Sequence, residues 1–198
     1  MKIWNYGGLF ADGTWLDGIW KKGTFEKSTW KNGTWLNGLW KSGTWFNGTW
    51  FNGTWKSGTW KKGEWKKGTW HKGLWESGRF DDGTWKSGTW KSGLFVNSTW
   101  EDGIWHAGDF EYAVWKKGTW KSGYFSGTWE NGIWEDGTFD MTYFGKWEKG
   151  TWKKGKVRIK KFGGENFSST VDPNQVIKLA EHCRTGMELH EKLNQLKK

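Results

Sequence analysis

Aromatic residues recur along most of this chain with a period of five. From Phe10 to Phe125, Trp or Phe occupies every fifth position through 24 consecutive slots. Glycine stands two residues before most of these aromatics, and threonine most often stands between them. One residue is missing after Phe125, the phase resumes at Trp129, slips again around 141–145 and ends at Val157. The pattern therefore predicts a repeat protein from about Phe10 to Val157.

A period of five fits neither an α-helix nor one long strand. Glycine at a fixed phase every five residues would also destabilise a helix. The repeat instead predicts a strand of about three residues followed by a two-residue corner, because polar residue–glycine dipeptides are turn signals. Neighbours in a strand point to opposite faces, and the residues beside Trp are often Lys. We therefore expect the Trp side chains to lie inside and the Thr and Lys side chains outside.

Charged residues at the threonine slot support a tight corner. Between residues 14 and 124 the slot is charged at three places. Each time, a residue that is or can be oppositely charged stands three positions earlier, in the pairs Lys61–Glu64, Glu76–Arg79 and His106–Asp109. Residues that flank a two-residue turn face each other. These pairs therefore predict a β-turn between successive aromatic residues.

The glycine slot also varies together with the aromatic slot. It is filled by a larger residue three positions after a phenylalanine, in the pairs Phe25–Ser28, Phe95–Ser98 and Phe110–Ala113. A smaller ring beside a larger neighbour is the compensation expected of a close-packed interior. The pairs predict that the aromatic and glycine slots share one interior.

The order of a small, a polar and a large apolar residue followed by two variable ones resembles the pentapeptide-repeat family, whose usual unit is Ala-Asp/Asn-Leu-x-x. The resemblance covers roughly residues 8 to 157 and implies an all-β fold, a β-solenoid in the form of a right-handed four-sided β-helix with about 20 residues per coil. Glycine would take the small inner slot and Trp the large inner slot. The chain departs from the family at that large slot, which is usually Leu or Phe.

The sequence gives conflicting signs of coil length. The segment from Thr14 matches the segment from Thr34, a shift of 20 residues, whereas Phe residues recur at a spacing of 15, at Phe80, Phe95, Phe110 and Phe125. We expect about 20 residues per coil, because a 15-residue triangle would hold three indoles badly. The alternative is an antiparallel meander of hairpins similar to the tryptophan zipper, in which Asn-Gly forms the turns.

Three segments follow from these patterns: an N-terminal cap at 1–9, the solenoid at 10–163, and a loop with an amphipathic helical tail at 164–198. Asp172 and Pro173 predict the start of the helix, as N-cap and first helical residue. The tail either caps the last coil or docks on a partner. The candidate partner-binding residues are Val176, Ala180, Cys183, Met187 and Leu193.

Composition limits the chemistry. The single cysteine excludes an intrachain disulfide and a cysteine zinc site. The histidines stand apart from carboxylate pairs at metal spacing, and the glycines are periodic rather than clustered before a helix. Carboxylates such as Asp81, Asp82, Glu101 and Asp102 fall at solvated corners. We expect no catalytic residues, no metal, no cofactor and no small-molecule substrate, and hence no enzyme.

The same features favour an interaction protein. We expect a non-catalytic rod that presents Thr and Lys faces to a protein partner or to further copies of itself. Its tracts resemble those of bacteriophage-encoded Trp/Gly repeat proteins, which implies a virion component. The net charge of +10 leaves non-specific nucleic-acid binding as an alternative, and exposed Trp would allow carbohydrate or choline binding. With no apolar run that resembles a signal peptide or a membrane span, we expect a cytoplasmic or virion-associated protein.

Overall fold

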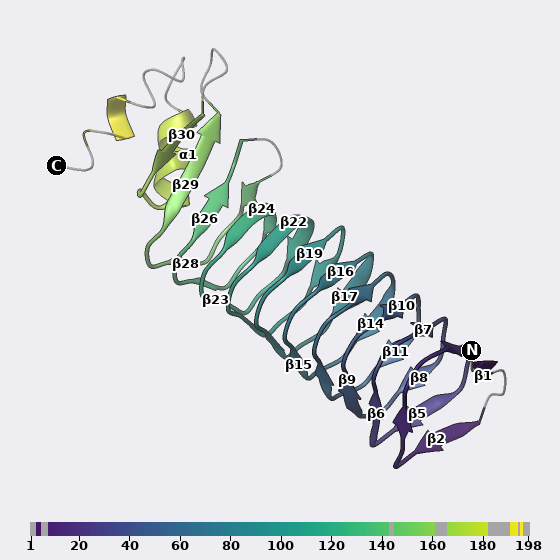
Figure 1. Ribbon diagram of the computed structural model, residues 1–198. Helices are drawn as coiled ribbons and strands as arrows, with labels where there is room; N and C mark the ends of the chain where they lie inside the picture. Colours follow the sequence, from purple (N-terminus) through teal and green to yellow (C-terminus); the bar gives the residue numbers. More distant parts are fainter. Residues whose placement is uncertain are drawn as a thin grey trace.

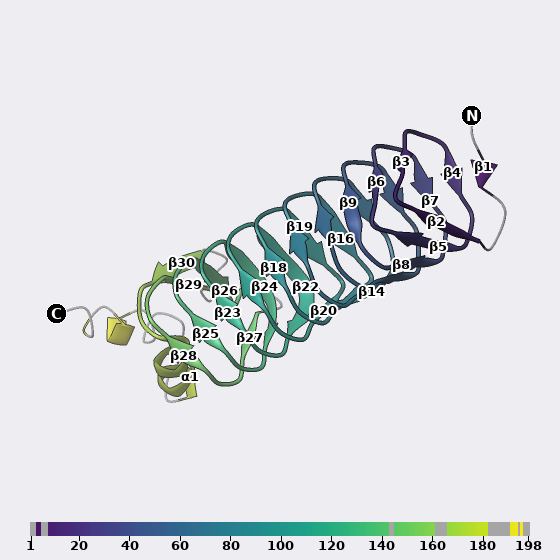
Figure 2. The same ribbon diagram turned by 90° about the horizontal axis from the view of Figure 1, so that it is seen from below.

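The computed structural model describes residues 3–4, 8–142, 145–160, 166–181, 191–193 and 195. These residues form a parallel β-solenoid, a rod whose coils are stacked from the N-terminal to the C-terminal end (Figure 1 and Figure 2). Each coil contributes one strand to a ten-stranded sheet, so the rod has ten coils. The expected β-solenoid is confirmed.

Every coil has three sides, and each side contributes one inward residue to a column that runs along the rod. This residue is aromatic except at the last position of column 3, which is Val157. Column 1 starts at Phe10 and includes the strands β2 (Leu9–Ala11), β5 (Thr24–Glu26), β8 (Leu39–Trp40), β11 (Thr54–Trp55), β14 (Gly68–Trp70), β17 (Gly83–Trp85), β20 (Thr99–Trp100) and β27 (Lys146–Trp147). Column 2 starts at Trp15 and consists of β3 (Thr14–Trp15), β6 (Ser28–Trp30), β9 (Gly43–Trp45), β12 (Thr59–Trp60), β15 (Leu74–Trp75), β18 (Thr89–Trp90), β21 (Ile104–Trp105), β23 (Thr119–Trp120), β25 (Ile133–Trp134) and β28 (Thr151–Trp152).

Column 3 contains the aromatic residues from Trp20 to Phe139, and its strands extend one coil further at each end. It includes β1 (Ile3–Trp4), β4 (Ile19–Trp20), β7 (Thr34–Trp35), β10 (Thr49–Trp50), β13 (Glu64–Trp65), β16 (Arg79–Asp81), β19 (Leu94–Val96), β26 (Thr138–Asp140) and β29 (Lys156–Lys160). Two longer strands turn the corner between columns 3 and 1 and join their sheets, namely β22 (Asp109–Trp115) and β24 (Tyr124–Trp129).

The coil has 15 residues, so the expected four-sided coil of about 20 residues is wrong. Trp35 pairs with Trp50, and Trp50 with Trp65, in parallel register. The 15-residue spacing of the phenylalanines, rather than the 20-residue match, corresponds to the length of one coil. The missing residue after Phe125 shortens one coil, so that Phe125 pairs with Phe139. The extra residues around 141–145 lengthen the next coil, so that its partners stand 18 positions apart, as Trp134 and Trp152 do.

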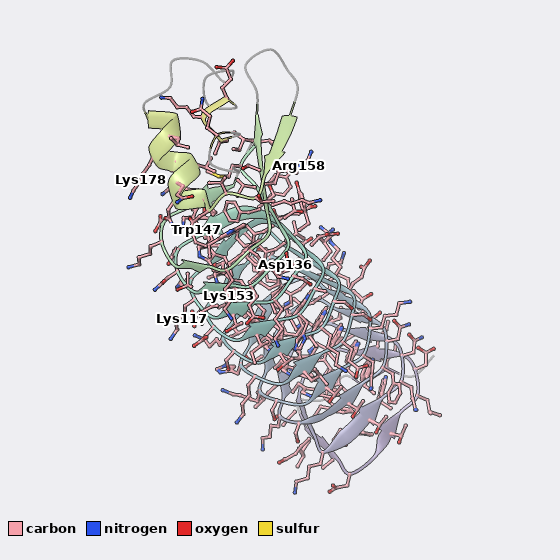
Figure 3. All side chains as sticks on the ribbon, turned by 90° about the vertical axis from the view of Figure 1, so that its left-hand side faces the viewer. Lys117, Asp136, Trp147, Lys153, Arg158 and Lys178 are labelled. Atoms are coloured by element: carbon pink, nitrogen blue, oxygen red, sulfur yellow. The ribbon has the colours of Figure 1, made fainter. Side chains whose placement is uncertain are left out.

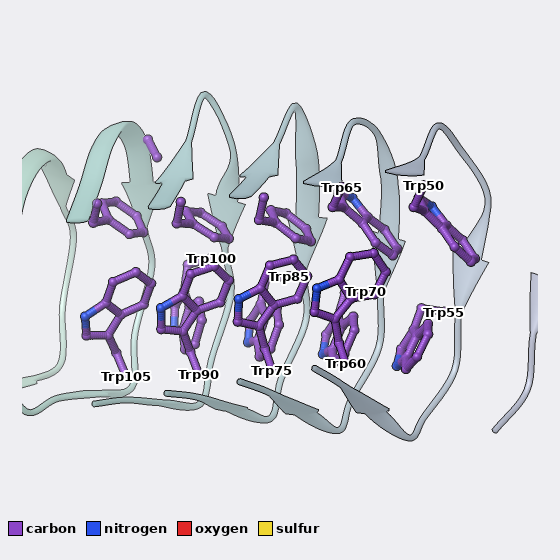
Figure 4. Close-up of a cluster of buried hydrophobic side chains, with 14 of the residues drawn as sticks. Trp50, Trp55, Trp60, Trp65, Trp70, Trp75, Trp85, Trp90, Trp100 and Trp105 are labelled. Carbon is purple, nitrogen blue, oxygen red and sulfur yellow. The ribbon is translucent and has the colours of Figure 1, made fainter. Parts of the chain in front are cut away.

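Three indoles fill the triangle because they meet edge to face. Trp50 and Trp55 have ring centroids 6.2 Å apart with planes at 72°, and Trp55 and Trp60 meet at 6.0 Å and 73°. Along a column the rings stack in parallel, for example Trp50 on Trp65 at 4.7 Å and 6° (Figure 4). Both are preferred aromatic geometries. The expectation that Trp lies inside is confirmed, since these side chains are fully buried.

The antiparallel alternative is wrong for the solenoid. All pairings among the described strands are parallel except the last, in which β29 pairs antiparallel with β30 (Asn166–Ser169). Successive coils are joined by the same backbone bonds: the amide of Thr34 donates to the carbonyl of Gly18, and the amide of Leu36 to that of Trp20. Each coil therefore needs its neighbour to satisfy its backbone groups.

Glycine is required at the corners by the neighbouring coil. Gly33 has a φ of +122°, and a Cβ added there would lie 2.3 Å from the carbonyl oxygen of Gly18, one coil earlier. The indole is a second neighbour, since the Cζ2 atom of Trp35 would lie 3.0 Å from a Cβ at Gly38. The predicted contact between the aromatic and glycine slots is confirmed, but the backbone of the preceding coil is the closer obstacle.

A different corner follows five of the phenylalanines. Here the positive φ moves one residue earlier, to Asp12, Lys27, Asp82, Asn97 and Tyr112. The following slot then has no positive φ, and at three of the five corners it holds a side chain, at Ser28, Ser98 and Ala113. Ser28 uses it to donate to the carbonyl of Glu26 and to accept from the amide of Gly13, at 2.7 and 3.1 Å. The exchange of Gly for Ser or Ala thus reflects a change of corner as well as of volume.

The C-terminal end of the rod is covered by α1 (Pro173–Glu181) and the hairpin of β29 and β30. The predicted start of the helix is confirmed: the Asp172 carboxylate accepts from the amide of Asn174 at 2.7 Å. The side-chain carbonyl of Asn174 in turn accepts from the indole N–H of Trp147 at 3.0 Å, which joins the helix to the solenoid.

Candidate interaction surfaces

Charged side chains cover the outside of the rod, including Lys117 and Lys153 (Figure 3). Many lysines face a carboxylate one coil away, at N–O distances of 2.9–3.4 Å, in the pairs Lys41–Glu26, Lys61–Glu76, Lys67–Asp82, Lys86–Glu101, Lys117–Asp102, Lys153–Glu135 and Lys154–Asp136. Such exposed pairs contribute little stability each. They do neutralise part of the Lys surface that nucleic-acid binding would use.

The corner pairs expected from the sequence find other partners. Lys61 pairs with Glu76 of the next coil rather than with Glu64 across the corner. Glu64 pairs with Lys66 at 2.9 Å, and Arg79 with Asp81 at 2.7 Å. The charged residues at these slots do form ion pairs, but not with the partners expected across the corner. Lys61 pairs with the next coil, and Glu64 and Arg79 pair with residues two positions further along their own segments.

His71 lies between two lysines of the adjacent coils. Its Nε2 atom is 3.4 Å from Nζ of Lys56. Partial burial and the positive charges of Lys56 and Lys86 lower the pKa of His71. The imidazole therefore adds less positive charge to this face than a free histidine would.

A shallow groove of about 540 Å³ runs along the corner that follows column 2 in the first coils. One wall is a ladder in which the amide of Asn47 donates to Asn32 and that of Asn32 to Asp17, at 3.4 and 3.2 Å. The opposite wall includes Thr34 and Thr49. Hydrogen-bonding groups therefore line this groove, and two of them, Asp17 and Glu64, are carboxylates.

Exposed apolar side chains gather on the first coils. Six large apolar residues before residue 52 are exposed, namely Ile3, Leu9, Leu16, Leu36, Phe46 and Phe51. The ring of Phe46 is 38% exposed and carries the Lys31 ammonium at 3.9 Å, and Phe51 is 46% exposed. Between residues 28 and 55 the only charges are Lys31 and Lys41. The stretch from residue 28 to residue 55 thus combines exposed apolar side chains with few charges. Sequence reasoning missed this feature, although Leu and Phe after Trp signal it.

Two of the predicted partner-binding residues, Val176 and Leu193, are placed at the opposite end. Val176 and Leu193 are buried in a cluster with Val157 and Val171, against which Trp152 packs. The helix includes Ala180, but the description does not extend to its side chain. Cys183 and Met187 lie outside the described residues. The two placed side chains thus contribute to a cap over the last coil, and partner binding by the tail stays a prediction.

A buried carboxylate fixes the irregular corner around 141–145. Asp140 is 3% exposed and accepts from the Tyr124 hydroxyl at 2.6 Å and from the Thr142 amide at 2.8 Å, and Arg158 lies 3.1 Å away. Burial alone would raise the pKa of Asp140, but the hydrogen bonds from Thr142 and Tyr124 and the Arg158 charge hold it below its ordinary value. Burial and the Asp140 carboxylate raise the pKa of Tyr124 to about 12. This cluster anchors the solenoid to β29.

The described part of the chain contains no group of three or more metal-ligating side chains. The carboxylates noted in the sequence are engaged in surface ion pairs, as Asp82 is with Lys67 and Asp102 with Lys117. A larger pocket of about 820 Å³ lies between the last corner and the start of α1, beside Trp152 and Lys156. Among the described segments, no helix has the length and apolarity needed to cross a membrane.

No protein-family model, curated protein or solved structure matches this chain significantly. The likeness to pentapeptide repeats therefore stays a resemblance of the repeat unit. The functional argument must start from the surfaces of this chain itself.

Proposed function

We propose that the chain is a non-catalytic structural and interaction protein, a rigid Trp-cored rod that joins a larger assembly. The observation that carries the proposal is the asymmetry of the two ends. The last coil is covered by the chain's own helix and hairpin, whereas the early coils expose Leu36, Phe46 and Phe51 within residues 28–55, where the only charges are Lys31 and Lys41. Leu36 and Phe51 follow the paired residues Trp35 and Trp50 of adjacent coils. Exposed apolar surface on a soluble protein commonly marks an interaction site.

The rod suits a mechanical role. Parallel backbone bonds and continuous ring stacks join each coil to the next, so a load at one end is carried through the whole core. The Thr and Lys faces keep the rod solvated between its ends. The resemblance to phage-encoded Trp/Gly tracts makes a virion the first assembly to test.

The two alternatives receive less support. Carbohydrate or choline binding by exposed Trp would need indoles on the surface, and Trp35 through Trp75 in all three columns are fully buried. Nucleic-acid binding would need free cations, and the lysines of the ion-pair ladder face carboxylates. DNA binding that weakens steeply with salt would restore the second alternative.

A site-specific crosslinking experiment tests the proposal. A photo-crosslinking amino acid is introduced at Phe46 or at Phe51, and for comparison at Ile104 or Ile133, which are each 41% exposed on the later coils. We expect positions 46 and 51 to crosslink to one defined protein of the native assembly, and positions 104 and 133 to give little product. Equal crosslinking from all four positions, or turnover of any substrate by the purified chain, would contradict the proposal.

A further inference from the structure

Column 2 is an uninterrupted stack of tryptophans from the first coil to the last. Phe10 and Phe25 begin column 1, and phenylalanine replaces tryptophan in column 3 from Phe80 onward. Column 2 contains no phenylalanine. Its members are Trp15, Trp30, Trp45, Trp60, Trp75, Trp90, Trp105, Trp120, Trp134 and Trp152.

The stack is regular over its whole length. Successive ring centroids are 4.7–5.3 Å apart, and successive planes deviate by 12° at most. Figure 4 shows Trp60, Trp75, Trp90 and Trp105 side by side in this arrangement. Parallel rings at this separation have overlapping π systems, so each ring can exchange an electron with the next.

The protons of the stack are held in place. Indole is among the most easily oxidised side chains, and its radical cation is readily trapped when a base removes the N–H proton. Trp45, Trp60 and Trp90 have buried N–H groups with no hydrogen-bond acceptor in range. Trp105 and Trp120 donate to backbone carbonyls, each at 3.1 Å, and a carbonyl is too weak a base to take the proton. A positive charge can therefore move along the column without proton transfer.

We propose that column 2 is an electron-transfer path along the rod. A one-electron oxidant near Trp152 takes one electron from that indole and leaves a radical cation. Each tryptophan in turn reduces the neighbour on its C-terminal side. The missing electron, or hole, therefore moves along the column to Trp15. A one-electron donor at the N-terminal end, of the phenol or thiol class, restores Trp15 and releases its own proton to water as it becomes a neutral radical. One electron thus enters at that end for each one removed at the other.

Burial confines the chemistry to the ends. The interior rings of the column are 0% exposed, so water and oxygen do not reach them. Trp15 is 5% exposed at the first coil, and Trp152 is partly exposed beside the pocket of Lys153 and Lys156. A hole that is not refilled therefore becomes a stable oxidation product at an end rather than in the middle.

A flash-oxidation experiment on the full chain tests the path. Cys183→Ser removes the only natural thiol, and Lys153→Cys carries a ruthenium photosensitiser that an added electron acceptor converts to an oxidant. The double variant Trp85→Phe/Trp90→Phe leaves phenylalanine at three successive slots with Phe80 and so interrupts all three columns. The matched control Trp50→Phe/Trp55→Phe also removes two indoles but leaves column 2 complete.

The readout is light-dependent oxidation of Trp15, measured by peptide mass spectrometry, with thermal melts to establish that each variant is folded. We expect oxidised Trp15 in the parent and in the control, and its loss in the interrupted variant. Equal oxidation in the interrupted variant would mean that diffusing oxidants reach Trp15, and no oxidation in any variant would mean that the column does not conduct. Either result overturns the proposal.

Discussion

Replacing Gly53 by alanine tests the packing of one coil on the next. Gly53 has a φ of +128°, where an L side chain is strained, and its Cβ would lie 2.4 Å from the carbonyl oxygen of Gly38 and 3.2 Å from Cζ2 of Trp50. Neither neighbour can turn away, because one is backbone and the other is a buried ring. The strain of the backbone costs about 1–3 kcal/mol. Overpacking adds about 1–3 kcal/mol more.

Gly13 provides the matched control. Its φ lies outside the left-handed region, and a Cβ there would meet the ring of Phe10 at 3.0 Å. The adjacent strand β3 is the end strand of the described ten-stranded sheet. Phe10 is only partly buried at the open end, so its ring can move. We expect Gly13→Ala to change the free energy of unfolding by no more than about 0.5 kcal/mol.

Thermal and urea denaturation followed by circular dichroism measure both variants. A loss of about 2–6 kcal/mol for Gly53→Ala is the sum of the two penalties. For a chain of this size, each kcal/mol lowers the melting temperature by about 2–4 °C. If both alanine variants had the melting temperature of the parent, the coils would not be in close backbone contact. The interpretation of the glycine slot depends on that contact.

Three further predictions follow from particular contacts. Lys27 has a φ of +46°, so Lys27→Asn should raise stability by a few tenths to about 1 kcal/mol, because Asn tolerates this region better; an unchanged urea midpoint would contradict the corner assignment. The lowered pKa of Asp140 means that its stabilising effect is present above pH 3.8, its ordinary value, and is lost as the pH falls further; Asp140→Asn should therefore be less stable at pH 7 and show a weaker acid dependence in melts. Asn174→Ala should free the indole N–H of Trp147 and cost about 1 kcal/mol or more, seen as a lower melting temperature, whereas the exposed neighbour Gln175→Ala should not.

Much of the fold was predictable from the sequence because the repeat leaves few choices. The aromatic period defines the inward face of every strand, and the polar residue–glycine dipeptides define the corners. The start of α1 at Pro173 was equally clear from its capping residues. These signals are local: each depends on residues within one or two repeats of each other.

Coil length was not predictable in the same way. It depends on how many inward rings close around the axis, which is a relation between residues 15 apart. The sequence showed that spacing at Phe80 and Phe95, but the expectation relied on interior volume, since a 15-residue triangle has less interior than a 20-residue square. Edge-to-face contacts, such as Trp60 on Trp65 at 71°, let three flat rings fill a triangle that three spheres would overfill.

The candidate surfaces were harder still to predict. The tail was the expected site, because an amphipathic helix outside the repeat presents an apolar face that can dock on a partner. The exposure of Phe46 and Phe51 becomes visible only when the strand period places them outside a core already full of tryptophan. The Asp140 cluster likewise depends on Tyr124, Thr142 and Arg158, which are brought together by a slip in the repeat that sequence reasoning treated as an interruption.

Two features depart from the majority repeat where the inward ring is Phe: the glycine slot holds Ser or Ala, and the positive φ moves one residue earlier. Both are related to the size of the inward ring. Where the ring is Trp, its Cζ2 atom reaches toward the slot three residues later, as Trp100 does toward Gly103 at 3.1 Å from a built Cβ. That slot must be glycine, and the corner takes its positive φ there. Where the ring is Phe95, the chain turns one residue earlier at Asn97, and Ser98 occupies the space while bonding to Val96 and Gly83. At five of the phenylalanine slots, the corner type thus changes together with the inward ring.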